Sequence, residues 1–462
     1  MRVCRRPTDT AFFLAVFSGI FAIWFVYFLL EFPGSVNYDF ASDFHYILRG
    51  GIWWNWDPIA YQALAVFLVQ VLGGGRLWGY VLFQMLCCCA ILSLSLLWLR
   101  RQALPRSVLV AGVIWAFAHP VMAYASSYCT EDALFSALVL LLTLQLAPIA
   151  LGKTLSRGDP AALLRTALPI ALLPLIRNNG MFLLAALLPF VFLLIPDKPT
   201  RRWLGAMLCG SIAFFALLQA VVFPALRVWQ TPVTEALAIP LQQVGRVVAM
   251  GHSMTPEQAA YLNNIMPLDV WKNIFSVHSV DPVKFDKQFH GWRVDTHFIR
   301  IWLGLGLRHP WDYIRAFLDQ TVLLWKPLRM NVIMRNSKQD WTFFGEKTVE
   351  VFPLWAKRSV WPAAAKAVYT GWYEAQKWLP MFFSPPLLYL SVFAMAARCF
   401  IKKQRGRLLA FVPLVSQYFL VATMIPAVAA RYVWPLYFSL PVLAGVCFAK
   451  SEPEPPAVNT PC

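Results

Sequence analysis

The sequence predicts an all-α polytopic membrane protein with about ten transmembrane helices, a membrane-associated first outer loop and a mostly helical extracytoplasmic insertion. Composition is the first reason: 59% of the 462 residues are hydrophobic and only 14% are charged, against about 25% charged in a usual soluble domain. The second is that apolar runs recur along the chain, several with the roughly 20 residues needed to cross the hydrocarbon layer. The third is the position of the basic residues between these runs.

The first apolar run, 11–31, follows the basic residues Arg2, Arg5 and Arg6. It is too long for the core of a signal peptide, and no small-residue cleavage site follows it. We therefore expect a helix that stays in the membrane.

Nine further runs are expected to cross the membrane, and one apolar run is not. The run 58–73 is short and is bounded by the helix-breaking residues Pro58 and Gly73. We expect it to lie in the outer interface or to dip into the membrane. The nine expected spans are 77–99, 107–124, 133–152, 161–176, 180–196, 204–226, 384–400, 408–424 and 433–449.

Basic residues support this topology, because short cytoplasmic loops collect Lys and Arg. If 58–73 does not cross, every basic cluster falls on one side of the membrane; if it crosses, the later clusters move outside, against the rule. The clusters are Arg100/Arg101/Arg106, Lys153/Arg157/Arg165, Lys198/Arg201/Arg202 and Lys402/Lys403/Arg405/Arg407. They explain much of the formal charge of +17, and no nucleic-acid-binding motif accompanies it.

The chain divides into four regions under this topology. An N-terminal transmembrane module of seven spans covers 1–226, with its first outer loop at 32–76. An extracytoplasmic insertion covers 227–383, C-terminal transmembrane hairpins cover 384–450, and a Pro-rich tail at 451–462 is expected to be disordered. The nine cysteines form no disulfide framework, and none has the spacing of a zinc site.

Two acidic clusters fall on the predicted outer side. Asp39 and Asp43 are four residues apart in the first outer loop and share one face of a helix, which suits a general base or a site for a metal or a sugar hydroxyl. A solvated loop with a helix cap is the alternative. Glu131 and Asp132 lie in the second outer loop, where the alternative is a helix start capped by Thr130.

Two isolated arginines also fall on this side. Arg177 is followed by Asn178 and Asn179 between two apolar runs, and Arg431 is followed by Tyr432 before the last run. An unpaired arginine at membrane depth is costly, and its planar fork suits a phosphate. A structural ion pair for the first arginine and an interfacial anchor for the second are the alternatives.

Further polar residues are weaker candidates. His45 lies close in sequence to Asp39, although a lone histidine is more often a hydrogen-bonded surface residue. Asp57 lies in the stretch Trp53–Pro58, which suits an interfacial aromatic belt better than a sugar platform. The chain has neither a P-loop nor a GxGxxG sequence, so an activated sugar is not expected to arrive as a cytoplasmic nucleotide sugar.

The order, spacing and sidedness of these residues resemble the GT-C superfamily of integral-membrane glycosyltransferases. That group includes protein O-mannosyltransferases, oligosaccharyltransferase catalytic subunits and the aminoarabinose transferases of lipid A. Its members carry acidic residues in the first two outer loops, where this chain has Asp39 and Asp132. The run 131–135 is similar to the family's acidic start of the following helix, and 177–180 is similar to an Arg-x-Asn-Gly junction of bacterial members. The likeness is nearest to bacterial membrane proteins with a dolichyl-phosphate-mannosyltransferase-like core.

The resemblance implies a sugar transfer from a polyprenyl-phosphate or -pyrophosphate donor to a lipid, glycan or protein acceptor outside the cytoplasm, in the plasma or inner membrane. Asp39 would be the base and Asp132 would orient donor or acceptor. Arg177 and Arg431 would hold the phosphate. Acceptor or sugar contacts would come from Asp43, His45, Asp57, Glu131, Asn178, Asn179 and Tyr432.

The chain also departs from the family. Many relatives have a His-Pro pair where this chain has Asp57-Pro58, and the second outer loop has no Asp-x-Asp metal pair. A divalent metal is therefore compatible with the site but not implied, and the block 227–383 matches nothing in the family. A transporter or flippase of lipid-linked saccharides, or a non-catalytic envelope assembly protein, would be the alternative function.

Overall fold

The structure, a computed structural model, is helical with almost no strand, at 77% helix. It describes residues 7–102, 104–156, 158–327, 352–356, 360–365, 367–368, 371 and 384–450. The basic residues at 2–6, Arg157, part of the insertion and the tail at 451–462 lie outside the described residues, so the expectations for them stay predictions.

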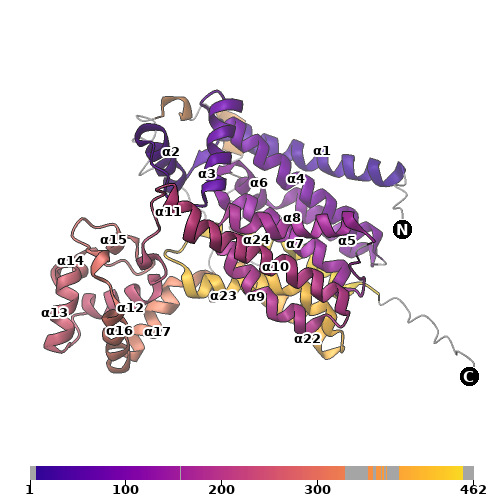
Figure 1. Ribbon diagram of the computed structural model, residues 1–462. Coiled ribbons are helices and arrows are strands. Elements are labelled where there is room, and N and C mark those ends of the chain that lie inside the picture. The colour runs from indigo at the N-terminus through magenta and orange to yellow at the C-terminus, as the bar shows by residue number, and fades with distance from the viewer. Residues whose placement is uncertain are drawn as a thin grey trace, which may run out of the picture.

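Roughly parallel and antiparallel helices form a bundle that makes up most of the molecule (Figure 1). At its centre lies α7 (Glu131–Ala150), whose side chains are buried on almost every side against α4, α8 and α24. The other bundle helices are α1 (Pro7–Leu30), α4 (Trp78–Arg101), α5 (Arg106–Ala118), α6 (Pro120–Ser127), α8 (Pro160–Ile176), α9 (Asn179–Leu194), α10 (Lys198–Leu217), α22 (Pro385–Ile401), α23 (Val412–Met424) and α24 (Trp434–Phe448).

Among the described residues, five helices are long and apolar enough to cross a membrane. A sixth is added if the bent pair α5 and α6 counts as one span, with 44° between its halves. The five are Thr8–Leu30, Trp78–Arg101, Glu131–Ala150, Lys198–Ala225 and Arg405–Met424, the last two including the short helical turns that adjoin α10 and α23.

The predicted count of ten spans is therefore not confirmed. Four of the expected spans form shorter helices: α8 and α22 have 17 residues, α9 has 16 and α24 has 15. At 1.5 Å per residue even the longest of these reaches only about 25 Å, less than the hydrocarbon thickness of about 30 Å. Where 107–124 was expected to be one helix, the chain bends at His119-Pro120, because proline cannot donate the hydrogen bond that would continue it.

The apolar run 58–73 forms a short helix, as its length predicted. It consists of α3 (Ile59–Val66) and the π-helical turn η1 (Phe67–Leu72), and it is too short for a regular span. Before it lies α2 (Tyr38–Gly50), and a two-stranded parallel ladder pairs β1 (Ser35–Val36) with β2 (Tyr128–Cys129). This ladder holds the segment after α1 and the segment after α6 side by side.

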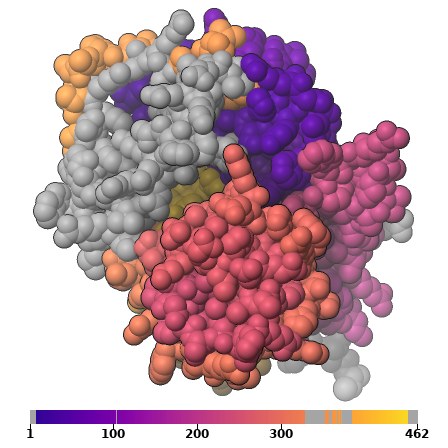
Figure 2. All heavy atoms as spheres, turned by 90° about the vertical axis from the view of Figure 1, so that its left-hand side faces the viewer, coloured from indigo at the N-terminus to yellow at the C-terminus, as the bar shows by residue number. Residues whose placement is uncertain are grey.

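The described part of the insertion forms a compact helical unit with a core of its own. Its helices are α12 (Ala238–Ala249), α13 (Pro256–Ile265), α14 (Leu268–Ile274), α15 (Asp281–Lys284), α16 (Thr296–Arg308) and α17 (Pro310–Gln320). Leu241, Trp271 and Phe298 are fully buried in that core. The unit lies at one end of the bundle, beside α2 and α11 (Phe223–Ala225) (Figure 1), and Figure 2 views the molecule from that end.

The opposite end of the bundle carries basic residues. There α1 begins and α4 ends, and Arg101 forms an ion pair of 3.0 Å with Asp9 across the two helices. The start of α10, with Lys198, Arg201 and Arg202, lies at the same end (Figure 1). The helical unit of the insertion and these basic residues are thus separated by the length of the bundle.

Candidate functional site

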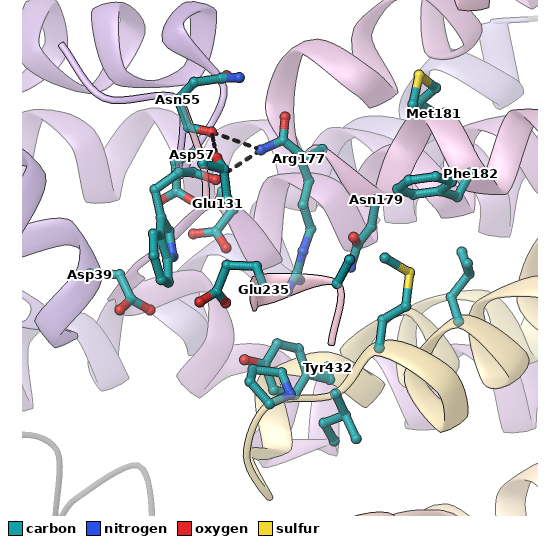
Figure 3. Close-up of a pocket in the computed structure, with 18 of the residues that line it drawn as sticks. Asp39, Asn55, Asp57, Glu131, Arg177, Asn179, Met181, Phe182, Glu235 and Tyr432 are labelled. Atoms are coloured by element: carbon teal, nitrogen blue, oxygen red, sulfur yellow. Dashed lines mark hydrogen bonds between the residues drawn. The ribbon is translucent and has the colours of Figure 1, made fainter. Parts of the chain in front are cut away.

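A pocket of about 420 Å³ lies where the bundle meets the insertion. Its walls come from the first outer loop, the start of α7, the α8–α9 junction, the ends of α10 and α23, and the first residues of the insertion. Figure 3 shows carboxylates on one side of it and apolar side chains on the other. The polar residues of its wall are Asp39, Asn55, Asp57, Glu131, Arg177, Asn178, Asn179, Gln219, Gln230, Thr231, Glu235, Gln417, Arg431 and Tyr432.

Asp39 reaches the pocket from the first turn of α2. This helix begins there because the side chain of Asn37 accepts a hydrogen bond of 2.9 Å from the backbone N–H of Phe40. The amide of Asn37 also donates to the Asp39 carboxylate at 3.3 Å, and Arg431 Nη2 donates to it at 2.8 Å. The dense surroundings raise the pKa of Asp39, and the Arg431 charge opposes this rise. The side chain is still 31% exposed, so it can meet a ligand.

Asp132 lies behind the wall of the pocket and joins the two arginines. Thr130 caps α7 at this point, and the Asp132 side chain is fully buried. One carboxylate oxygen forms an ion pair with Arg177, and the other lies 3.3 Å from Nε of Arg431. Because Arg431 also contacts Asp39, four segments far apart in sequence are linked through one chain of charges. Asp132 is not part of the pocket wall, whereas its neighbour Glu131 is.

Arg177 reaches the pocket from a tight turn between α8 and α9. A Cβ on Gly180 would come within 2.5 Å of the Leu173 backbone, so glycine is needed for this close approach. The side-chain amide of Asn178 donates to the backbone carbonyls of Asn55 at 3.3 Å and Trp56 at 2.8 Å (Figure 3). The turn is thereby fastened to the first outer loop.

Asp43 and Asp57 form a buried carboxyl pair next to the pocket. Their side chains are within hydrogen-bonding reach of each other, and Asp57 lies in the pocket wall while Asp43 lies behind it. Burial raises the pKa of both groups well above its usual range, and the neighbouring carboxylates raise it further. Because the pKa of both groups is raised, the pair holds a proton more tightly than a solvated aspartate does.

The remaining predicted residues divide between pocket and surface. Asn179 and Tyr432 lie in the pocket wall, and the Tyr432 ring lies 5.1 Å from the Arg177 guanidinium. His45 is exposed on α2, with its ring 5.9 Å from that of Tyr46 and outside the pocket wall. The structure thus brings together every predicted residue except His45.

Sequence reasoning missed the contribution of the insertion. Glu235 faces the pocket, and both its carboxylate oxygens accept hydrogen bonds of 2.7 Å from Lys284, which also lies 3.2 Å from Asp281. Lys284 Nζ is 5.6 Å from the ring of Trp56, another residue of the wall. Glu235 and Lys284 are 49 positions apart in a polar block, and no local pattern marks them. Asn55, whose amide donates to Gln219, was likewise missed.

Comparison with known proteins places the chain in a family without assigning an activity. No curated protein and no solved structure matches it. A family described as "Family of unknown function (DUF6020)" matches residues 63–455. Asp132, Arg177 and Arg431 lie inside the matched region and Asp39 lies before it. Since the match covers well over half of the 462 residues, the chain belongs to the DUF6020 family of unknown function.

Proposed function

We propose that this protein is a membrane glycosyltransferase of the GT-C type, which moves a sugar from a polyprenyl-phosphate or -pyrophosphate donor to an acceptor outside the cytoplasm. One observation carries the proposal: Arg177 and Arg431, joined by Asp132, face a pocket whose wall also holds the partly exposed Asp39. An anion site and a candidate base are thus adjacent.

The two arginines suit the phosphate of the donor. Both lie in the pocket wall, while the carboxylate that pairs with them is fully buried behind it. The buried carboxylate fixes the positions of the two guanidinium groups, and Arg431 also pairs with Asp39 in the pocket wall. Planar guanidinium groups bind phosphate oxygens in pairs, and they would neutralise the charge that develops as the phosphate leaves.

The apolar wall suits the polyprenyl chain. Met181 and Phe182 lie on the side of the pocket away from Asp39 (Figure 3), and Phe215, Leu420 and Met424 complete this wall from α10 and α23. An isoprenoid chain could lie against these side chains with its phosphate at the arginines. The sugar would then project toward the carboxylates.

The side of the membrane follows from the basic residues. They collect at the end of the bundle away from the pocket, and basic residues favour the cytoplasmic side. We infer that the pocket opens outside the cytoplasm and that ten segments cross or enter the membrane, the shorter ones where the bilayer is locally thinned.

The chemistry we propose is a single inverting displacement. Asp39 accepts the proton of an acceptor hydroxyl, and the hydroxyl oxygen forms a bond to the anomeric carbon. The bond from that carbon to the phosphate oxygen breaks, and its electron pair leaves with the polyprenyl phosphate. Arg431 contacts Asp39 at 2.8 Å in the structure, so a phosphate that draws Arg431 toward itself would release Asp39 to act as the base.

Purified protein in lipid nanodiscs, incubated with radiolabelled polyprenyl-phosphate sugars and cell-envelope acceptors, tests the proposal. We expect labelled product from the unchanged protein and none from Asp39→Asn, with donor binding retained. The control is Asp269→Asn, an exposed aspartate on α14 outside the pocket. Full activity of Asp39→Asn would remove the proposed base.

A flippase is the rival function, since it would use the same arginines without breaking a bond. An assay in proteoliposomes distinguishes the flippase from the glycosyltransferase. Movement of a labelled lipid-linked sugar across the bilayer, with no transfer to any acceptor, would replace the glycosyltransferase proposal with the flippase.

A further inference from the structure

A cluster of two histidines and one aspartate lies in the insertion, away from the pocket. His252, His309 and Asp312 each offer a ligand atom within 4.8 Å of the other two. His252 lies in the loop after α12, His309 lies at the corner between α16 and α17, and Asp312 lies in the first turn of α17. The proposed sugar transfer uses none of these residues.

We propose that His252, His309 and Asp312 bind a divalent transition-metal ion of the Zn²⁺ class. Two imidazoles and one carboxylate form a ligand set that borderline-soft ions such as Zn²⁺ prefer over Mg²⁺ or Ca²⁺. His252 Nε2 already lies 3.0 Å from Asp312 Oδ2, close to the separation of about 3.4 Å between ligands of a tetrahedral ion at about 2.1 Å.

The neighbours of the cluster orient its ligands. His309 Nε2 lies 2.9 Å from the Ser253 carbonyl; if it donates there, Nδ1 keeps its lone pair for the ion. Arg246 Nε lies 3.5 Å from Asp312 Oδ1, which leaves Oδ2 toward His252. Carbonyl partners of histidine ligands and hydrogen-bonded carboxylate ligands are usual around protein-bound metals.

The rings of the two histidines lie 5.0 Å apart, with 18° between the planes. A metal ion binds each imidazole in its neutral form. The competing explanation is a salt bridge between a protonated His252 and Asp312, in which His309 is not involved.

The ion would fasten the insertion at a point that leads back to the pocket. Asp312 lies near the start of α17, and Gln320 at its end donates hydrogen bonds to the carbonyls of Ile425 at 2.8 Å and Pro426 at 3.2 Å. Both of those residues line the pocket. Because the ion would join the α12–α13 loop to the start of α17, it would fix the position of this helix against the end of α23.

Metal binding to the full-length protein tests the inference independently of any sugar transfer. Detergent-solubilised protein is stripped with EDTA and dialysed against ZnCl₂, and bound metal is measured. We expect one ion per chain and a higher thermal midpoint with Zn²⁺. His252→Ala and His309→Ala should each weaken binding by more than about 100-fold, because losing a ligand costs more than the 10- to 100-fold typical of a residue that only supports one.

The matched control is His297→Ala, because His297 also lies beside a carboxylate of the insertion, 3.3 Å from Glu257. It should bind the ion as the unchanged protein does. Absence of saturable binding by the unchanged protein would overturn the inference, and so would equal loss in the His297 variant.

A variant that gains a spectroscopic signal shows that lost metal binding in the other variants is not caused by unfolding. His252→Cys with Co²⁺ should show a thiolate-to-cobalt charge-transfer absorption, which requires residue 252 to contact the ion. Cobalt bound without that absorption would exclude position 252 as a ligand and overturn the proposed site.

Discussion

Two charged clusters contribute to the pocket wall, one from the bundle and one from the insertion, and they are built in opposite ways. The bundle cluster consists of Asp132, Arg177 and Arg431. Its carboxylate side chain is 0% exposed, whereas the side chains of Arg177 and Arg431 are 11% and 17% exposed. The insertion cluster consists of Glu235 and Lys284. Here the lysine side chain is only 2% exposed, whereas the glutamate side chain is 22% exposed. In the bundle cluster it is the cations that reach the pocket wall, and in the insertion cluster it is the anion.

Under the proposed function, the two clusters would bind different parts of the substrate. Arginine forks with a buried counter-charge suit a phosphate, whereas a carboxylate held by a hidden lysine suits hydroxyl donors of a sugar or an acceptor. Burial raises the pKa of Glu235, and Lys284 opposes this rise and favours the ionised form. If the two clusters bind different parts of the substrate, changes in the bundle cluster impair use of the donor and changes in the insertion cluster impair use of the acceptor.

The largest expected effect is on stability, from Asp132→Asn. This change leaves Arg177 and Arg431 facing each other without their buried counter-charge, and removing one partner of a buried pair costs about 3–5 kcal/mol. Chemical unfolding in detergent measures it. The control is Asp9→Asn, which breaks a pair whose arginine is 41% exposed and should cost less than about 1 kcal/mol. Equal losses of unfolding free energy in the two variants would show that the bundle cluster contributes no more to stability than the ion pair of Asp9 does.

Arg431→Lys should come next, with a loss of donor use. Arg431 contacts Asp39 through Nη2 and Asp132 through Nε, and a lysine cannot span both with a planar fork. Losing one hydrogen bond to a charged group costs about 1.5–3 kcal/mol, so we expect kcat/KM for the donor to fall roughly 10- to 100-fold. Arg100→Lys, at the opposite end of the bundle, should have no effect. A change confined to the acceptor KM would contradict the comparison.

The sequence revealed the bundle cluster because its members interrupt apolar runs. An arginine or aspartate between hydrophobic segments is visible without any knowledge of its neighbours, and Asp39, Asp132, Arg177 and Arg431 were predicted in this way. Glu235 and Lys284 lie in a block where charge is common, so nothing marked them before the fold brought them together. His45 was named through closeness in sequence to Asp39, but its position on α2 turns it to the surface.

The number of spans was harder to predict than the site. Apolar composition does not say where a helix ends, and α8, α9, α22 and α24 are each shorter than 18 residues. The break between α5 and α6 was signalled by Pro120, which the run of apolar residues around it obscured.

The carboxyl pair beside the bundle cluster should give a smaller effect, visible as a pH dependence. The pKa values of Asp43 and Asp57 are raised in the folded protein, so folding favours the protonated pair. The stability they contribute is present in mild acid and is lost as pH rises through the raised pKa. Asp57→Asn, whose amide can donate to Asp43, should reduce this loss by about 1.4 kcal/mol for each unit of the pKa shift removed.

Unfolding free energies at pH 5 and pH 8 measure this difference in the two proteins. Asp159→Asn is the control, because Asp159 caps α8 at the opposite end of the bundle, where it accepts a hydrogen bond from the backbone N–H of Ala162. An unchanged slope between the two pH values in Asp57→Asn would show that the pair does not hold the proton.

Glu235→Gln should give the smallest effect and the sharpest test of the two-sided pocket. The amide keeps the shape of the side chain, and Lys284 keeps Asp281 at 3.2 Å, so the insertion should stay folded. The amide oxygen can still accept a hydrogen bond from an acceptor hydroxyl, so the change removes only the difference between a charged and a neutral hydrogen bond, about 1–1.5 kcal/mol. We expect the acceptor KM to rise by roughly 5- to 12-fold with the donor KM unchanged. Glu257→Gln, at a carboxylate that is 67% exposed, should change neither constant. Should the donor KM rise instead, Glu235 would contact the phosphate part of the donor, and the two clusters would act on one part of the substrate.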